Sequence, residues 1–361
     1  MNDDEQRQES EPAEDAAPGW QAIDAELATI YGAAEPFHYG TLVSYRLGGP
    51  DPLDGVSVYA RQEPVPHWHY VTYGLTELYE KESQNAEYSG FGFELTFRLA
   101  RQGEEEPPAW AINFLQNLAR YVFSSGNVFE PGHHLDANGP IKVGEHTKLT
   151  AVAFVEDPEL GTARSPFGKF TFIQAVGITE DEMEIMQAWN TLRVMETVKS
   201  RLPLYITDLS RNSLFDDPGV LAAAEEGSRA EGSNTGHLYF DNLLWEEKRH
   251  LLKSNGYILQ MGAKQTLSLA RILPARLAHG KELALIGQER RVLLIPDLQN
   301  RLVENGDELQ IYLNTEAVTE LARRLEPRAG EFELETLKAL KIRIEKTLIR
   351  DADGNVVETI G

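Results

Sequence analysis

An alternating segment at residues 91–99 constrains the fold of this chain more than any other part of it. The odd-numbered positions are apolar: Phe91, Phe93, Leu95, Phe97 and Leu99. The positions between them are Gly92, Glu94, Thr96 and Arg98. A period of two is typical of a strand, because successive side chains of a strand point to opposite faces. The segment therefore predicts a strand with an aromatic face in a core and a second, polar face. We favour an outward position for Glu94 over the alternative of a buried carboxylate.

The surrounding segments predict a mixture of strands and helices. Apolar residues at helical spacing predict helices at 20–30, 110–122, 179–195 and 315–325. Strands are predicted at 41–47, 56–61, 70–73, 149–155, 169–176, 204–207 and 340–344, with a hairpin around Asp353 and Gly354. Residues 131–140, PGHHLDANGP, are predicted to form a loop. Strands and helices do not alternate strictly in either half, which favours an α+β fold.

The length favours two domains. A chain of 361 residues exceeds one ordinary core, at about 150 residues per domain. Large apolar residues become scarce between 216 and 236, where the chain reads DDPGVLAAAEEGSRAEGSNTG. We expect a disordered acidic tail at 1–18, a first domain at 19–213, a linker or hinge at 214–236, and a second domain at 237–361.

The charge balance bears on the kind of partner. The formal net charge is −23. A protein that binds nucleic acid needs a basic surface to neutralise phosphates, so this charge argues against nucleic acid as a partner. It favours a basic partner protein through long-range attraction, although an acidic surface can also serve solubility alone.

Composition sets further limits. No window approaches the roughly 20 apolar residues that span a bilayer, and the acidic N-terminus is unlike a signal or transit peptide. We therefore expect a cytoplasmic protein without a membrane partner. The chain has no cysteines, which removes disulfides, thiol nucleophiles and thiolate metal sites.

Two histidines, His67 and His69, are the strongest candidates for a chemical site. They share one face of a predicted strand, and His133, His134 or Asp136 could supply a further metal ligand. No HExxH spacing and no GxSxG nucleophile motif occurs in the chain. We favour structural histidines over a metal site or a catalytic base. No catalytic residue, metal or cofactor is assigned, and a metal-dependent enzyme using His67, His69 and His133 is kept as an alternative.

Tyr121 and Phe123 close the helix predicted at 110–122 and lead into a loop with Gly126 and Asn127. Aromatic side chains at such a position either pack in the core or, when partly exposed, anchor a partner protein. The residues themselves leave both alternatives open.

Several long motifs together resemble the Suppressor of fused family. In the first half they are LGGPDPLDGVSVY, HWHYVTYGLTELY, SGFGFELTFRL, LARYVFSSGNVF and TFIQAVGITEDE. In the second half they are LPARLAHGKEL and LQIYLNTEAVTELARRL. The resemblance extends over residues 20–348. It implies two mixed α/β-sheet domains, joined by a hinge in a clamp-like arrangement, and no enzymatic activity.

The resemblance also implies a mode of binding. Animal members bind Gli transcription factors by clamping an extended peptide between the two domains, so that the peptide joins sheet edges from both. Bacterial members are regarded as immunity proteins that neutralise toxins. This chain lacks the long insert found in the second domain of the animal proteins and resembles a compact bacterial member.

Particular residues follow from the same resemblance. Tyr121 matches a tyrosine that contacts the peptide in animal members. After Gly132, this chain has His133 where those members have an aspartate that pairs with the Gli motif. Residues 238–240 are expected to lie near the clamp strand of the second domain, and the motif ARLAHG matches the element that faces it. The partner-binding set implied is Tyr121, Phe123, His133, His134, Leu238, Phe240, Arg276, Leu277 and His279.

The resulting hypothesis is a non-enzymatic immunity protein that clamps a basic toxin domain or an extended peptide by strand addition. A Gli-type regulator of transcription factors is the other alternative besides the enzyme, and the missing aspartate argues against it.

Overall fold

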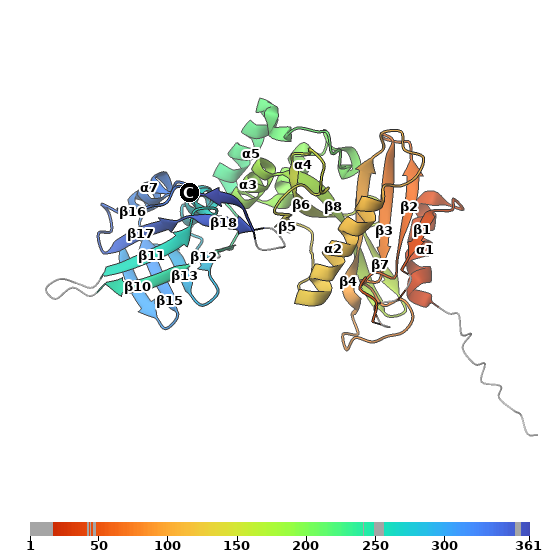
Figure 1. The fold of residues 1–361 in the computed structure, drawn as a ribbon, viewed down its shortest axis with the longest axis horizontal. Coiled ribbons are helices and arrows are strands. Elements are labelled where there is room, and N and C mark those ends of the chain that lie inside the picture. The colour runs from red at the N-terminus through yellow and green to blue at the C-terminus, as the bar shows by residue number, and fades with distance from the viewer. Residues whose placement is uncertain are drawn as a thin grey trace, which may run out of the picture. The chain divides into compact units, whose positions relative to one another are not determined.

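A computed structural model (Figure 1) describes residues 17–361, except 42, 44, 46, 47, 241, 249–255 and 351–354 and the side chains of 350 and 357. Residues 1–16 of the predicted acidic tail and the turn of the predicted C-terminal hairpin lie outside the described residues. The chain forms two compact units. Unit 1 comprises Met1–Glu180 and Lys199–Asn212, and unit 2 comprises Asp181–Val198 and Ser213–Gly361.

Unit 1 is built on one mixed sheet. Its strands are β1 (Phe37–Gly40), β2 (Gly55–Arg61), β3 (His67–Tyr73), β4 (Tyr88–Ala100), β5 (His134–Asp136), β6 (Leu149–Glu156), β7 (Thr162–Ser165) and β8 (Gly168–Thr179). The order across the sheet is β1-β2-β3-β4-β8-β6-β5, and β7 pairs with β8. The central pair β4 and β8 runs parallel, whereas the other pairs are antiparallel. The sheet therefore ends in β1 on one side and in β5 on the other.

Two helices, α1 (Pro18–Tyr31) and α2 (Ala109–Ser125), cover opposite faces of this sheet. Ile23 and Leu27 lie at helical spacing on α1 and pack into one cluster with Val71 of β3. The neighbours of Val71 along β3, Trp68 and Tyr70, point the other way and pack in the cluster that α2 joins. Both faces of the sheet are therefore buried.

Strand β4 confirms the strand predicted at 91–99 and corrects the prediction for its polar face. The apolar residues pack on the α2 side as expected. Glu94, Thr96 and Arg98, however, are completely buried on the α1 side instead of pointing outward. The alternation of a strand shows which residues share a face, but not what another part of the chain places over that face.

Unit 2 contains two further mixed sheets and a hairpin. Its helices are α3 (Glu180–Ala188), which begins at the unit boundary, α4 (Thr191–Val198), α5 (Pro218–Glu231), α6 (Thr266–Leu277) and α7 (Thr315–Arg324). Its strands are β9 (His237–Tyr239), β10 (Leu244–Lys248), β11 (Gly256–Gly262), β12 (Leu283–Ile286), β13 (Arg291–Pro296), β14 (Arg301–Asn305), β15 (Glu308–Leu313), β16 (Gly330–Glu333), β17 (Leu340–Glu345), β18 (Thr347–Arg350) and β19 (Val356–Ile360). The sheet orders are β14-β15-β13-β12-β9 and β10-β11-β17-β16, and β18 pairs with β19. The five-stranded sheet therefore ends in β9.

The predicted α+β class is confirmed, and most strongly periodic segments form the predicted elements. Four segments differ. The helix predicted at 179–195 is divided into α3 and α4, and its first residue, Thr179, is the last residue of β8. The loop predicted at 131–140 contains β5. The strand predicted at 204–207 begins instead with the short turn η2 (Pro203–Tyr205). Leu204 and Tyr205 have φ of 50° and 52°, which is incompatible with an extended strand. The described residues within 41–47 form no strand, and β1 lies just before them.

The predicted linker at 214–236 contains a short 3-10 turn, η3 (Leu214–Asp216), followed by α5. The Asp217 side chain caps α5 by accepting from the amide of Gly219 at 2.8 Å. At Gly227 the helix approaches Trp189 so closely that an added Cβ would lie 2.2 Å from the indole ring. This segment is thus a packed helix of unit 2, and the hinge assigned to it stays a prediction.

No helix in the part of the chain that the structure describes is long and apolar enough to cross a membrane.

Candidate partner-binding edges and a buried polar network

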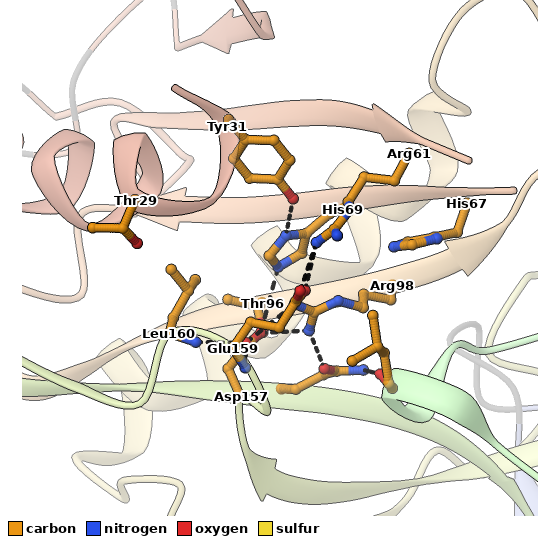
Figure 2. Close-up of polar contacts among 12 residues, drawn as sticks. Thr29, Tyr31, Arg61, His67, His69, Thr96, Arg98, Asp157, Glu159 and Leu160 are labelled. Atoms are coloured by element: carbon orange, nitrogen blue, oxygen red, sulfur yellow. Dashed lines mark hydrogen bonds and ion pairs between the residues drawn. The ribbon is translucent and has the colours of Figure 1, made fainter. Parts of the chain in front are cut away.

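A charged network is enclosed in unit 1, on the sheet face that α1 covers (Figure 2). Its centre is Arg98 of β4, whose guanidinium forms a two-pronged pair with Asp157 at 2.6 and 3.1 Å. Both side chains are fully buried. Glu159 accepts from Arg98 at 2.9 Å and from Arg61 of β2 at 2.6 and 2.8 Å. Each of these four charges therefore has an opposite partner, which a buried charge requires.

Asp157 is further fixed by neutral donors. Thr96 donates its hydroxyl at 2.7 Å, and the amides of Glu159 and Leu160 donate at 2.9 and 3.1 Å. Burial alone would raise the pKa of Asp157, but the contact with His69 and the charge of Arg98 hold this pKa well below its usual range. Asp157 therefore remains a carboxylate throughout the physiological pH range.

His69 connects this carboxylate to α1. Its Nδ1 lies 2.6 Å from the hydroxyl of Tyr31, and its Nε2 lies 3.4 Å from Asp157 Oδ2. Burial, together with the charge of Arg98, lowers the pKa of His69 to about 4, so the ring is neutral at pH 7. We assign Tyr31 as the donor to Nδ1 and place the ring proton on Nε2, facing the carboxylate. The ring is fully buried, and its contacts fix the last residue of α1 to the sheet.

In the part of the chain that the structure describes, His133 does not lie beside His67 and His69. His67 is buried beside His69 on β3, with Nδ1 2.7 Å from the carbonyl oxygen of Val65. His133 precedes β5, and the sheet order places β4, β8 and β6 between β3 and β5. Within the described part of the chain, no group of three or more His, Asp and Glu side chains is arranged to hold a metal ion. The three histidines of the metal-enzyme alternative therefore do not form one site in the described part of the chain.

Glu94 is a second buried carboxyl group on the same face. One oxygen accepts from the amide of Gly74 at 3.0 Å and from the amide and hydroxyl of Thr76 at 2.9 and 2.7 Å. The other accepts from the hydroxyl of Thr72 at 2.6 Å. Burial raises the pKa of Glu94 to about 7, although these bonds oppose the shift. Glu94 thus anchors the segment that follows β3.

The residues expected to bind a partner in unit 1 fall into two places. Tyr121, 40% exposed, stacks on Phe129 at 5.6 Å between ring centroids, in the loop that leads to β5. His133 is exposed and its carbonyl accepts from Phe154 of β6 at 2.9 Å, where the pairing of β5 begins. His134 is the first residue of β5, and burial lowers its pKa to about 4. These residues gather around β5.

Phe123 lies elsewhere on the last turn of α2. It is half-buried, and its ring contacts Tyr45 and Phe91 edge-on at 5.0 and 4.9 Å between ring centroids. It therefore lines a different surface from Tyr121, although the two residues are only two positions apart.

In unit 2, the expected residues Leu238 and Phe240 point inward. They are 7% and 2% exposed and belong to the core of the unit. Their neighbours His237 and Tyr239 have exposed side chains, and Tyr239 is 66% exposed. Successive side chains of a strand point to opposite sides. The inward position of Leu238 and Phe240 therefore implies the outward position of His237 and Tyr239.

The backbone of β9 has the same alternation. Gly236 accepts from the amide of Ala284 at 3.0 Å, and Phe240 donates to the carbonyl of Ile286 at 2.9 Å. In a parallel pair, the residues that bond to the neighbour alternate with residues whose N–H and C=O face away. The main-chain groups of His237 and Tyr239 therefore face away from β12.

The expected residues at the end of α6 and in the turn after it contact the segment that leads to β9. Arg276 donates to the carbonyl of Ser233 at 3.1 Å. The exposed ring of His279 lies against Gly232, where an added Cβ would be 2.4 Å from it. Leu277 is buried in the core. The role of these residues in partner binding stays a prediction, whereas their contacts fix the segment that precedes β9.

Two mixed-sheet units, each with a short strand at the end of a large sheet, define the architectural class of this chain as a two-unit α+β protein. The crystal structure of Drosophila Suppressor of Fused shares this fold, with a TM-score of 0.76, 23% identity, and coverage of 92% of this chain and 98% of that chain. A chain of the Sufu–Fu complex crystal structure has a TM-score of 0.54 and 31% identity, and covers 58% of this chain and 98% of its own length.

Comparison of the amino-acid sequence with known families and proteins identifies its relatives. Residues 49–212 match the family described as Suppressor of fused protein (SUFU). The mouse protein, Suppressor of fused homolog, is 38% identical over 235 residues, which is 60% of this chain and 48% of the mouse protein. This chain thus spans about half the length of the curated relatives it matches. Residues 49–212 of this chain thus match the Suppressor of fused family, as the motifs of the first half predict.

Proposed function

We propose that this chain is a non-enzymatic binding protein that captures an extended segment of a partner protein as an added strand. The receiving edges are β5 in unit 1 and β9 in unit 2. The observation that carries the proposal is that the two large sheets end in these strands. A sheet edge offers main-chain donors and acceptors to an extended peptide. These are also the segments that the family resemblance marks for partner binding.

The short length of the two edge strands supports a partner that pairs with both of them. Strands β5 and β9 have three residues each, so either edge alone offers few main-chain bonds. Two weak contacts on one partner reinforce each other, because the second becomes intramolecular after the first has formed. Side chains beside the edges, such as Tyr121 and Tyr239, then supply specificity.

The partner that we propose is a basic toxin domain, and the chain is a compact bacterial member of the family that acts as its immunity protein in the cytoplasm. The net charge of −23 supports a basic partner, because complementary charge accelerates encounter. His133 supports a partner other than a Gli-type motif, because the resemblance implies an aspartate there to pair with that motif. A sequestering role requires no catalytic group.

Co-expression with the product of the adjacent gene tests the immunity role. We expect affinity-tagged chain to retain that product and to restore growth of cells that express it. A neighbouring toxin that neither binds nor is neutralised would contradict the immunity role, while leaving strand addition to be tested by other means.

A further inference from the structure

The side-chain ammonium of Lys81, in the loop between β3 and β4, lies in a shell of four oxygen atoms. The oxygens and their distances from Lys81 Nζ are Glu77 Oε2 at 2.8 Å, Ser83 Oγ at 2.9 Å, and the main-chain carbonyl oxygens of Tyr88 at 2.6 Å and Phe167 at 2.8 Å. An ammonium group has three N–H donors, so four oxygens surround it more fully than its hydrogen bonds require. An all-oxygen shell of carboxylate, hydroxyl and main-chain carbonyl groups is typical of a bound cation.

The four oxygens come from three segments of unit 1. Glu77 and Ser83 belong to the loop, Tyr88 is the first residue of β4, and Phe167 lies in the turn between β7 and β8. At Gly168, next to Phe167, an added Cβ would lie 2.6 Å from the main-chain carbonyl carbon of Tyr88. The segments are therefore closely packed, and the ammonium fastens the loop to the sheet where they meet.

Glu77 supplies the negative charge of the shell. Its side chain is 6% exposed, and its carboxylate also accepts from the amides of Glu82, Ser83 and Gly90 at 2.7, 2.5 and 3.1 Å. Burial alone would raise the pKa of Glu77, but the bonds with Lys81 and these amides lower it to about 2, so the group is charged at neutral pH. Because the other three oxygens are neutral, the shell carries one negative charge and suits a cation of single charge.

The distances indicate the size of the cation. Oxygen ligands lie at about 2.3–2.6 Å from Ca²⁺ and about 2.0–2.1 Å from Mg²⁺. The four oxygens here lie 2.6–2.9 Å from the ammonium nitrogen, so a small ion would have to draw them inward. Potassium is close to an ammonium group in size, and main-chain carbonyl oxygens can replace its hydration shell.

We infer that these four oxygens form a site for a potassium-sized monovalent cation, and that this chain fills the site with its own Lys81 ammonium. The ammonium takes the place of an external ion, so closure of the loop in the wild type does not depend on which salt is present. The site goes beyond the proposed function, because none of its residues belongs to β5 or β9.

Hydrogen exchange in Lys81→Ala tests the site. The amides of Ser83 and Gly90 report on closure of the loop, because both donate to Glu77. In tetramethylammonium chloride, we expect these amides to exchange at least about tenfold faster in the variant than in the wild type, since charged hydrogen bonds are lost. Potassium chloride should restore slow exchange saturably, because potassium fits the shell and tetramethylammonium is too large for it. The wild type should exchange equally in both salts.

Lys169→Ala is the matched control. Lys169 Nζ lies 2.5 Å from Glu87 Oε1 and 4.5 Å from the centroid of the Tyr88 ring, so it has one carboxylate and a ring face in place of an oxygen shell. We expect the same amides to exchange equally in both salts in this variant. Equally fast exchange of Lys81→Ala in both salts, or a potassium effect of the same size in Lys169→Ala, would overturn the site.

Acylation of the wild-type lysines by a dilute succinimidyl ester is a second test, which does not require a variant to fold. The side chains of Lys81 and Lys142 are equally exposed, at 31%, but Lys142 pairs with a single carboxylate, that of Glu145. Because acylation requires the amine to leave its acceptors, we expect Lys81 to react at least about fivefold more slowly than Lys142, as measured by mass spectrometry of peptides. Equal rates would overturn the proposal, since the ammonium would not be held by its shell.

Discussion

Glu94 is a buried carboxyl group whose charge state changes near neutral pH. Its pKa is about 7 in the folded protein against an ordinary 4.5, so the folded state binds the proton more tightly between these values. Stability conferred by this proton is complete below about pH 4.5 and is lost as pH rises towards 7, a change of about 3 kcal/mol. In Glu94→Gln, the amide oxygen still accepts from Gly74 and Thr76, but the titration is gone.

Urea unfolding of the wild type and of Glu94→Gln at pH 5 and pH 7.5 measures this difference. We expect the wild type to lose about 2 kcal/mol more than the variant between these two pH values, since part of the change already occurs below pH 5. The same pH dependence in both proteins would show that Glu94 does not titrate in this range.

Arg98 is the second residue on which the interior of unit 1 depends. Arg98→Ala leaves Asp157 buried without its main cationic partner, so we expect a loss of about 3–5 kcal/mol in the free energy of unfolding. Arg164 of β7 is an exposed arginine, and Arg164→Ala should change this free energy by less than about 0.5 kcal/mol. Chemical denaturation measures both, and a similar small effect of the two substitutions would contradict a stabilising network.

The sequence identifies the polar residues of this network but not their burial. The alternation at 91–99 places Glu94 and Arg98 on one face, and the histidines of β3 share a face as well. Their partner Asp157 lies 59 residues beyond Arg98, and no local pattern connects the two. Burial of this face depends on α1, whose packing is decided by the tertiary fold.

At the scale of the element, long periodic segments are predictable and short edge strands are not. The helix α2 carries apolar residues at helical spacing and the strand β6 carries a nearly continuous apolar run, so their sequences suffice. Strand β5 has three residues within PGHHLDANGP, a typical loop composition, and exists as a strand through its pairing with β6. Of the two edge strands in the proposed function, β5 is therefore the one that local sequence does not predict.

Strand β9 allows a direct test of edge pairing. The amide of Tyr239 faces away from β12, so Tyr239→Pro removes a donor to an added strand without removing a bond to β12. We expect partner affinity to fall at least about tenfold in Tyr239→Pro, through loss of the main-chain bond and steric blocking by the ring. Tyr239→Ala, the control, removes the side chain alone. If calorimetry shows equal affinities for the two variants, the main chain of β9 does not pair with the partner.

At the scale of the whole molecule, the chain passes between its two units at 180/181, 198/199 and 212/213. The sequence suggests one linker at 214–236, because that segment lacks large apolar residues. It nevertheless folds, since the small residues of α5, such as Gly227, allow a close approach to Trp189. Composition thus indicates small side chains, whereas only the packing shows whether they form a linker or a tight contact.

The net charge of −23 is also a property of the whole molecule, and it predicts that salt slows association with a basic partner. We expect the association rate constant with the partner to fall about tenfold or more between 50 mM and 500 mM salt, because screening removes long-range attraction. The dissociation rate constant should change much less. Stopped-flow measurements resolve both constants, and an association rate independent of salt would contradict electrostatic recognition.

Backbone hydrogen exchange with and without the bound partner tests the central claim most directly. Strand addition predicts that amides of β5 and β9 exchange more slowly in the complex, because main-chain bonds to the added strand protect them. Protection confined to side-chain surfaces elsewhere, with unchanged exchange in both edge strands, would contradict strand addition as the mode of binding.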